Sequence, residues 1–331
     1  MRYISTSDLV IGDTVAREVK DRRGRLLLSA GSDIHSRQII KRLLHNNVAG
    51  VYVNDNWSSD IFIEQVIDEE TINKTMDALE SFNIDRIKQC ADEIVDKIVN
   101  SDKYMNDVAC IRKYDENTAL HSINVAIASV TLGIGIGLSY ERLKNLSVGA
   151  LLHDIGKTRV PINILNKKGK LNENEREIMK KHPRYGYDII RKDANTTSPV
   201  RVIAYQHHEN WDGTGYPKQL KGEQIYILAS IVHICDVYDA LISKRTYKKP
   251  FSISKTIEIL SNGCNKQFDP ELLAGFFRYI PIYNKGTIVK LSNNEQALVY
   301  ENNRGDMLSP TVKLKDGKII DLRLSSLSII D

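Results

Sequence analysis

The sequence has little of what disordered, fibrous or low-complexity proteins are made of. Its 331 residues include only 19 glycines and 8 prolines, whereas 42% of them are hydrophobic and 27% are charged. This composition excludes collagen-like and disordered architectures and favours globular domains. At about 150 residues per domain, the length predicts two domains and leaves room for a third. The chain is therefore long enough to bury at least one large core.

The sequence also lacks an excess of charge and any closely spaced cysteines. Its 46 basic and 42 acidic residues give a formal net charge of +4, which argues against a nucleic-acid polymer or an anionic membrane as a partner. The four cysteines form no CxxC pair; they are Cys90, Cys110, Cys235 and Cys264. This spacing fits reduced thiols and excludes a zinc finger or a disulfide framework.

No targeting or membrane-spanning segment is evident. The opening MRYISTSDLVIGD has no basic start followed by an apolar run, so it does not fit a secretory signal peptide. The longest apolar stretch, residues 125–138, contains Ser129, Thr131 and three glycines. It is too short and too polar to span a bilayer and favours a buried helix. We therefore predict a cytoplasmic protein without a membrane partner.

Both ends of the chain predict small modules. Residues 1–65 indicate an α+β module for sensing, docking or dimerisation, with strands over 12–20, 25–30 and 48–53 and a helix over 36–44. Residues 283–331 alternate apolar and polar side chains between turn signals, which indicates a β-rich module.

Residues 66–110 predict a helical connector with an amphipathic stripe formed by Met76, Leu79, Phe82, Ile87, Ile94 and Ile98. Two interpretations stay open for this connector. It either transmits a signal or pairs two subunits, or it simply packs on the domain that follows.

The chemistry concentrates in residues 111–282, which are mostly helical. His153 and Asp154 lie near the end of an apolar helix, where neighbouring side chains can converge on one metal ion, and Gly156 is expected to end that helix. Lys157 follows one helical turn beyond His153. An isolated His-Asp pair is weak evidence, because chance explains most of them.

Further histidines and acids accompany this pair. His207 and His208 are adjacent and precede Glu209, and two neighbouring imidazoles are costly to bury unless they bind something. Asp236 and Asp239 lie one turn apart in an apolar helix, where buried carboxylates need a cation or a donor.

Other histidines can be explained by a structural role without a metal ion. His121, on an apolar helix face, can equally be a satisfied core histidine, and His182, before Pro183, a helix-end residue. His233 fits a packing residue or one that supports a ligand from behind. The set as a whole offers nitrogen and carboxylate but no thiolate, which favours Fe, Mn or Zn and fits a two-metal hydrolase acting on a phosphate.

In their order and approximate spacing, these motifs resemble the HD-GYP family, a branch of the HD-domain metal phosphohydrolases. The resemblance covers roughly 111–280, and its most specific pieces are HDIGK at 153–157, HHENWDGTGYP at 207–217 and DVYDAL at 236–241, together with His121 and His182. It implies a mainly α fold, with a helical HD-domain bundle over 111–282 between the two small modules.

The resemblance also implies an activity and its residues. Cyclic di-GMP would be hydrolysed to pGpG, and further to GMP as an open extension, by a metal-bridging hydroxide. Two divalent ions, Fe or Mn with Zn as the alternative, would be held by His121, His153, Asp154, His182, His207, His208 and Asp236. Asp154 would bridge the ions, and it and Lys157 would be the catalytic residues.

Substrate contacts are implied as well. Lys157, Arg245 and Lys248 would contact the phosphates, although basic residues on a solvated helix face are the alternative interpretation. Tyr216, in the GYP loop, would contact the nucleotide as an aromatic tip, or the loop would bind a partner protein.

Several alternatives stay open. The substrate could be another cyclic dinucleotide such as cyclic GMP-AMP, or the domain could sense cyclic di-GMP without cleaving it. Three-metal members of the family carry a Glu one turn before the first His, where this chain has Asn117, with Glu116 one residue off. We therefore expect two ions rather than three. A homodimer also stays open.

Overall fold

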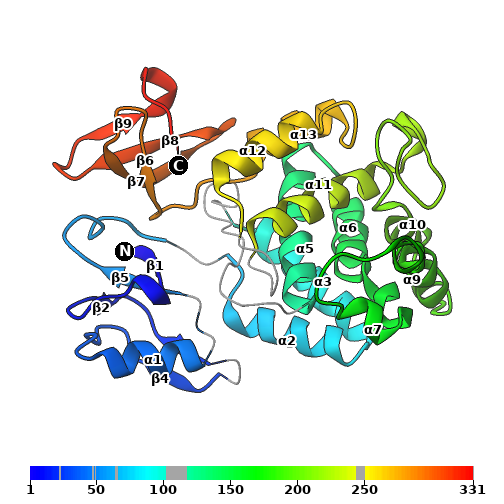
Figure 1. The fold of residues 1–331 in the computed structure, drawn as a ribbon, viewed down its shortest axis with the longest axis horizontal. Coiled ribbons are helices and arrows are strands. Elements are labelled where there is room, and N and C mark those ends of the chain that lie inside the picture. Colours follow the sequence, from blue (N-terminus) through cyan, green and yellow to red (C-terminus); the bar gives the residue numbers. More distant parts are fainter. Residues whose placement is uncertain are drawn as a thin grey trace. The chain divides into compact units, whose positions relative to one another are not determined.

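The computed structural model describes residues 1–21, 24–46, 48, 50–63, 66–101, 118–243 and 250–330. These residues form two compact units (Figure 1). The described residues up to 63 and those from 281 onward make a β-rich unit, and the described residues between them make a helical unit. The mainly helical fold with small sheets near both termini confirms the predicted fold class.

The β-rich unit contains three antiparallel sheets. Their strand orders are β1-β5-β2, β3-β4 and β6-β7-β8-β9. The elements of its first part are β1 Arg2–Ser5, β2 Thr14–Val15, β3 Val19–Lys20, β4 Leu26–Leu28, α1 Arg37–His45 and β5 Gly50–Asn54. The elements of its last part are β6 Ile288–Lys290, β7 Gln296–Asn303, β8 Asp306–Leu314 and β9 Ile319–Asp321. The predicted C-terminal hairpins are therefore present.

The first and last parts of the chain share a core within this unit. Met1, Ile61 and Ile63 pack with Leu298 of β7 in one buried cluster. The indole of Trp57 donates to the carbonyl oxygen of Leu314 over 3.0 Å. The predicted division into four segments stays a prediction, but the two end segments do not stand apart from each other, because each covers apolar surface of the other.

The helical unit is built around one apolar helix. Its helices are α2 Glu69–Glu80, α3 Ile84–Val99, α5 Thr118–Gly135, α6 Tyr140–Leu152, α7 Ile162–Leu165, α8 Glu173–Met179, α9 His182–Ile190, α10 Ser198–Gln206, α11 Ile227–Ile242, α12 Ile253–Asn262 and α13 Pro270–Tyr279. Helix α5 is apolar on nearly every face, so it is buried on nearly every face. It lies among α3, α6 and α11 (Figure 1).

Helix α5 is also the one helix in the described part of the chain with the length and hydropathy to cross a membrane. In the structure, however, 72% of its apolar window is buried against the rest of the chain. That burial agrees with the predicted buried helix, because a core helix and a membrane span differ chiefly in what surrounds them.

The connector packs on the domain that follows it. Helices α2 and α3 contact α5, and α3 also contacts α6. On α3 the predicted stripe is correct, since Ile87, Ile94 and Ile98 are fully buried. On α2 it is wrong. Phe82 is 55% exposed because it falls in the turn between the helices, with a φ of 51°. The buried residues of α2 are Thr71, Ile72, Thr75 and Ala78.

Candidate metal centre

The predicted ligands converge mainly because they lie at ends of helices. His153 follows the last residue of α6, and Asp154 precedes the short 3-10 helix η2, Ile155–Arg159. His182 is the first residue of α9, and His207 caps the C-terminus of α10. Side chains at helix ends can point along the axis rather than away from it, so several helices can aim at one point.

Gly156 brings two of these helix ends together. A Cβ atom on Gly156 would lie 1.9 Å from the carbonyl oxygen of His182 and 2.4 Å from the amide nitrogen of Gly186. Only a residue without a side chain therefore lets η2 approach α9 so closely. The prediction that Gly156 ends the helix before it is wrong. Helix α6 ends at Leu152, and Gly156 is not among the described residues with the positive φ that a helix-ending glycine needs.

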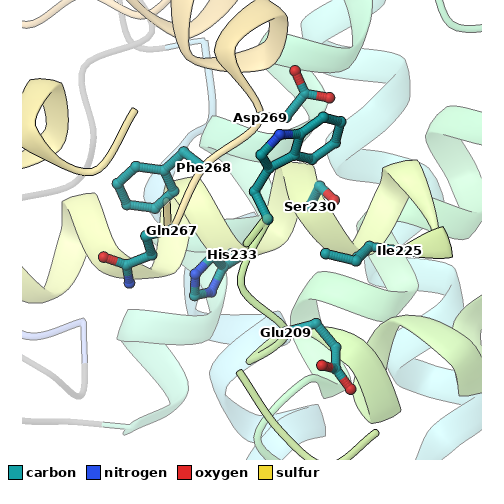
Figure 2. Close-up of a pocket in the computed structure, with 8 residues that line it drawn as sticks. Glu209, Ile225, Ser230, His233, Gln267, Phe268 and Asp269 are labelled. Carbon is teal, nitrogen blue, oxygen red and sulfur yellow. The ribbon is translucent and has the colours of Figure 1, made fainter. Parts of the chain in front are cut away.

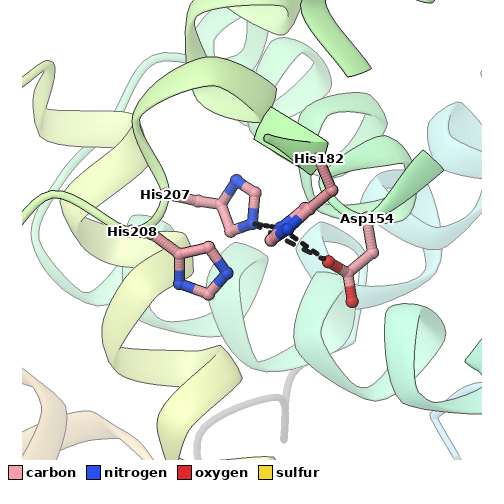
Figure 3. A group of neighbouring side chains, drawn as sticks. All are labelled: Asp154, His182, His207 and His208. Carbon is pink, nitrogen blue, oxygen red and sulfur yellow. Dashed lines mark hydrogen bonds and ion pairs between the residues drawn. The ribbon is translucent and has the colours of Figure 1, made fainter. Parts of the chain in front are cut away.

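The carboxylate of Asp154 lies at the centre of the cluster. Its Oδ2 is 3.3 Å from Nε2 of His153. Its Oδ1 is 3.4 Å from Nε2 of His182 (Figure 3). Potential ligand atoms of Asp154, His182, His207 and His208 all lie within 4.8 Å of one another, and so do those of His121, His153 and Asp154. Asp154 thus belongs to two groups, each of which could hold an ion.

Main-chain hydrogen bonds fix the histidines for metal binding. The Nδ1 atoms of His153, His182 and His207 each contact the carbonyl oxygen three residues earlier, at 2.7, 2.8 and 3.0 Å. A carbonyl oxygen only accepts, so each Nδ1 carries the proton and each Nε2 keeps a lone pair. This is the arrangement in which proteins hold histidine ligands.

The inward-facing lone pairs have no protein donor to satisfy them. Nε2 of His182 lies 3.3 Å from Nε2 of His207, although both rings have their proton on Nδ1. Within the described residues, Nε2 of His153 and Oδ1 of Asp154 are buried without a hydrogen-bond partner. Buried lone pairs that face one another are costly unless a cation lies between them. The residues present therefore fit a metal site.

Burial keeps the imidazoles of His182 and His208, on one side of the cluster, in the neutral form. It lowers the pKa of His182 to about 3 and lowers the pKa of His208 well below its usual value. Burial alone would raise the pKa of Asp154, but the positive charge of Lys157 outweighs burial and holds that pKa well below the usual range. Neutral imidazole and ionised carboxylate are the forms that bind metals.

The opposite side of the cluster is an ion-paired network. His121 places Nε2 3.0 Å from Asp236 and Nδ1 2.7 Å from Asp239. Burial lowers the pKa of His121, but its hydrogen bonds to the two carboxylates outweigh burial and raise that pKa to about 10. His121 must therefore release a proton before it can bind a metal ion. Asp239 lies behind His121, as a residue that orients a ligand would.

The remaining predicted residues have mixed outcomes. Lys157 contacts Oδ2 of Asp154 at 2.5 Å. Arg245, Lys248, Asn117 and Glu116 lie outside the described residues. The ring of Tyr216 is half-buried and stacks on His208, with centroids 4.8 Å apart, so it is not an exposed aromatic tip. His233 is buried, and its Nδ1 contacts the carbonyl oxygen of His207 at 2.7 Å, which fits the interpretation of a supporting residue.

Glu209 has a structural role that was not predicted from the sequence. This residue lines a small pocket beside His233 (Figure 2) and is 2% exposed. Its carboxylate accepts hydrogen bonds from the amides of Lys218 over 2.6 Å and Leu220 over 3.0 Å. The signal was present in the sequence, because an acid that precedes a glycine-rich loop can accept that loop's free amides.

Comparison with known families gives one match across this region. A family model described as HD domain matches residues 100–272, just over half of the chain.

Curated relatives match the same region. The cyclic di-GMP phosphodiesterase PA4108 of Pseudomonas aeruginosa is 34% identical over 223 residues, which are 67% of this chain and 54% of that protein. The cyclic di-GMP phosphodiesterase response regulator RpfG of Xanthomonas campestris is 40% identical over 144 residues, 43% of this chain and 38% of that protein. The 3'3'-cGAMP-specific phosphodiesterase 2 of Vibrio cholerae is 38% identical over 157 residues, 47% of this chain and 30% of that protein. The chain thus spans about half, or less, of the length of these relatives.

A solved structure has a similar fold. The HDG"Y"P protein Bd1817 from Bdellovibrio bacteriovorus superposes with a TM-score of 0.55 at 21% identity, covering 83% of this chain and 97% of that one. At this identity the likeness concerns the fold alone.

Proposed function

We propose, on the premise that this chain belongs to the HD domain family and carries the HD-GYP signature, that it is a metal-dependent phosphodiesterase of cyclic di-GMP. The product would be pGpG, with further cleavage to GMP as an extension. The curated relatives named for cyclic di-GMP support this substrate. The observation that carries the proposal is the buried cluster in which histidine lone pairs face Oδ1 of Asp154 and neither has a protein donor among the described residues.

Two divalent ions would be held by the seven predicted ligands: His121, His153, Asp154, His182, His207, His208 and Asp236. Nitrogen and carboxylate donors without thiolate favour iron or manganese, with zinc as the alternative. When bound, such ions supply Lewis acidity toward a phosphate and lower the pKa of water.

The chain's own residues would hold the two ions in place and orient the substrate phosphate. Asp154, shared by both groups of ligand atoms, would keep the two sites at a fixed separation. The side chain of Lys157 is 31% exposed beside Asp154, so its ammonium group can reach a phosphate that enters the site. A charge-assisted hydrogen bond from Lys157 would orient that phosphate and stabilise the charge that develops on it. Tyr216, Arg245 and Lys248 stay proposed substrate contacts.

A second substrate, cyclic GMP-AMP, is favoured by one specific observation. A Vibrio cholerae relative specific for 3'3'-cGAMP is 38% identical over 157 residues. A domain that binds cyclic di-GMP without cleaving it is the other alternative, and the complete set of predicted ligands argues against it.

The test is turnover of a substrate panel by protein purified without oxygen. Cyclic di-GMP, 3'3'-cGAMP and cyclic di-AMP would be incubated separately, with metal content measured on the same sample and a chelator-treated sample as the control. We expect metal-dependent formation of pGpG from cyclic di-GMP. Faster cleavage of 3'3'-cGAMP would move the assignment to the second candidate. Binding of cyclic di-GMP by metal-loaded protein without any cleavage would contradict both.

Three further expectations belong to this proposal. The chain would act in the cytoplasm, would dock a protein partner at its GYP loop and would form a homodimer. Light scattering on the purified protein tests the homodimer, since a monomer across the accessible concentration range would contradict it.

A further inference from the structure

His208 differs from the other histidines of the cluster. Four of them have Nδ1 fixed by an acceptor: His121 by Asp239, and His153, His182 and His207 by main-chain carbonyl oxygens. The ring of His208 has no hydrogen bond within the part of the chain that the structure describes. It still lies in one group of potential ligand atoms with Asp154, His182 and His207 (Figure 3). Something other than a hydrogen bond must therefore orient this ring.

Contacts with neighbouring rings orient the ring of His208 instead. The ring of Tyr216 stacks on His208 with centroids 4.8 Å apart and an interplanar angle of 27°. From other directions, His207 lies 4.2 Å away and His182 meets the ring edge-on at 4.9 Å. His233 also meets the ring edge-on, at 6.4 Å. His207, His182 and His233 are each fixed by a hydrogen bond of their own, so Tyr216 is the ring contact whose position depends on the loop.

The loop that carries Tyr216 is folded directly onto His208. The amide of Tyr216 donates to the carbonyl oxygen of His208 over 3.1 Å. A Cβ atom on Gly215 would lie 2.2 Å from the amide nitrogen of Asn210 and 2.5 Å from the carbonyl oxygen of His208. Residue 215 must therefore be glycine for the loop to pass this close to the chain beneath it.

Glu209 ties down the far end of the same loop. It is the next residue after His208, and its two carboxylate oxygens accept the amides of Lys218 and Leu220 (Figure 2 shows Glu209 in its pocket). Hydrogen bonds to an ionised carboxylate are stronger than neutral ones. The segment 209–220 is thus closed at both ends around His208.

We propose that this segment, the GYP clamp (residues 209–220), is a positioning device for the metal ligand His208. Tyr216 supplies the surface on which the imidazole stacks, and Glu209 anchors the loop that presents Tyr216. The inference rests on the proposed function only in taking His208 as a metal ligand. It gives Tyr216 a role toward the metal site instead of, or in addition to, contact with the nucleotide.

The experiment measures metal affinity without substrate. The full chain would be loaded with Mn²⁺, and the affinity of its ions measured by competition with a chromophoric chelator. The variants are Tyr216→Leu, which removes the aromatic ring, and Tyr216→Phe, which keeps it. Tyr140→Leu is the matched control, because Tyr140 is 46% exposed at the start of α6, away from the cluster.

We expect Tyr216→Leu to weaken one of the ions about tenfold, the lower end of what losing a partner behind a ligand costs. Tyr216→Phe and Tyr140→Leu are expected to stay within about twofold of wild type, because stacking needs the ring rather than the hydroxyl. Glu209→Gln keeps the size of the anchor but replaces one acceptor by a donor. It is expected to lie between Tyr216→Leu and wild type, and it tests the clamp even if Tyr216→Leu does not fold.

Other outcomes overturn the clamp. Wild-type affinity in both Tyr216→Leu and Glu209→Gln would contradict it, and a raised KM for cyclic di-GMP in those variants would then make Tyr216 a substrate contact alone. Equal weakening in Tyr216→Phe and Tyr216→Leu would show that the hydroxyl matters instead of the stacked ring. Failure of the wild-type protein to bind Mn²⁺ at all would instead contradict the proposed function, so the two failures are distinguishable.

Discussion

The two sides of the candidate metal centre solve the problem of burying polar side chains in opposite ways. On one side, His153, His182 and His207 are fixed by main-chain carbonyl oxygens, and their inner nitrogens have no protein donor. On the other side, His121 is paired with Asp236 and Asp239 through both ring nitrogens. We call these the carbonyl-anchored side and the carboxylate-paired side.

The difference concerns what a metal ion would change on each side. On the carbonyl-anchored side a cation would satisfy lone pairs that nothing else satisfies, so binding needs no rearrangement of protons. On the carboxylate-paired side a cation must displace a proton from His121, whose pKa is raised to about 10. Asp154 therefore connects a preformed site with one in which a proton on His121 must first be displaced.

Removal of Asp154 should have the largest effect, because this carboxylate belongs to both groups of potential ligand atoms. Asp154→Ala is expected to lower turnover of cyclic di-GMP by several orders of magnitude, since the ligand shared by a metal pair is lost. Steady-state kinetics with metal analysis checks this. Asp92→Ala, which removes a half-exposed carboxylate paired with Lys144, is the control. Retention of about a tenth of wild-type turnover with comparable metal content would make the assignment wrong.

Asp239→Ala should affect the carboxylate-paired side alone. It removes the partner of Nδ1 of His121, and loss of such a partner costs about 10- to 100-fold in metal affinity. Asp239→Asn keeps an oxygen acceptor and should lie closer to wild type. Chelator competition measures both variants. If the two were equally harmful, the charge of Asp239 itself would matter, as it would for direct binding of a third ion.

Lys157→Ala tests the boundary between metal binding and substrate binding. We expect both ions to be retained. We expect kcat/KM to fall by a factor that corresponds to about 1.5–3 kcal/mol of lost transition-state stabilisation, the scale of a charged hydrogen bond to phosphate. Lys144→Ala is the matched control, because Lys144 pairs with Asp92 on another surface. Arg245→Ala is expected to behave like Lys157→Ala. Unchanged kinetics in both variants would return these residues to the interpretation of a solvated face.

The smallest expected effect lies away from the cluster, at the pair of Asp68 and Lys97. Burial raises the pKa of Asp68, but its hydrogen bonds to Lys97 and Thr71 outweigh burial and lower it to about 2. A carboxyl group with a lowered folded-state pKa stabilises the fold above its unfolded value, 3.8, and loses that contribution as the pH falls toward 2.

Asp68→Asn should therefore destabilise the protein near neutral pH by about 1 kcal/mol or less, because the carboxylate is half-exposed and water screens the pair. Urea unfolding of both proteins checks this, and the difference should narrow below about pH 4. A difference that stays constant down to acid pH would show that the carboxylate charge is not the cause.

The sequence was sufficient where local pattern and chemistry agree. The apolar face of α3 and the turn residues of the C-terminal hairpins predicted those elements, because each is determined by neighbours along the chain. The ligand motifs were also readable, since imidazoles beside carboxylates in apolar helices demand a partner wherever they fold.

What the sequence did not reveal depends on contacts between distant residues. Strand β1 is only four residues long, and it is defined by its pairing with β5. Phe82 fits the predicted stripe but falls in a turn whose position is determined by packing. The role of Gly156 is visible only once η2 meets α9, because the close approach involves atoms about 30 residues away.

The most direct test of the central claim is a metal titration of chelator-stripped protein under anaerobic conditions, with turnover of cyclic di-GMP followed at each step. The account predicts that turnover rises with Mn²⁺ or Fe²⁺ and reaches its plateau at two bound ions per chain. A plateau at one or three ions, or tight metal binding with no turnover at any stoichiometry, would contradict it.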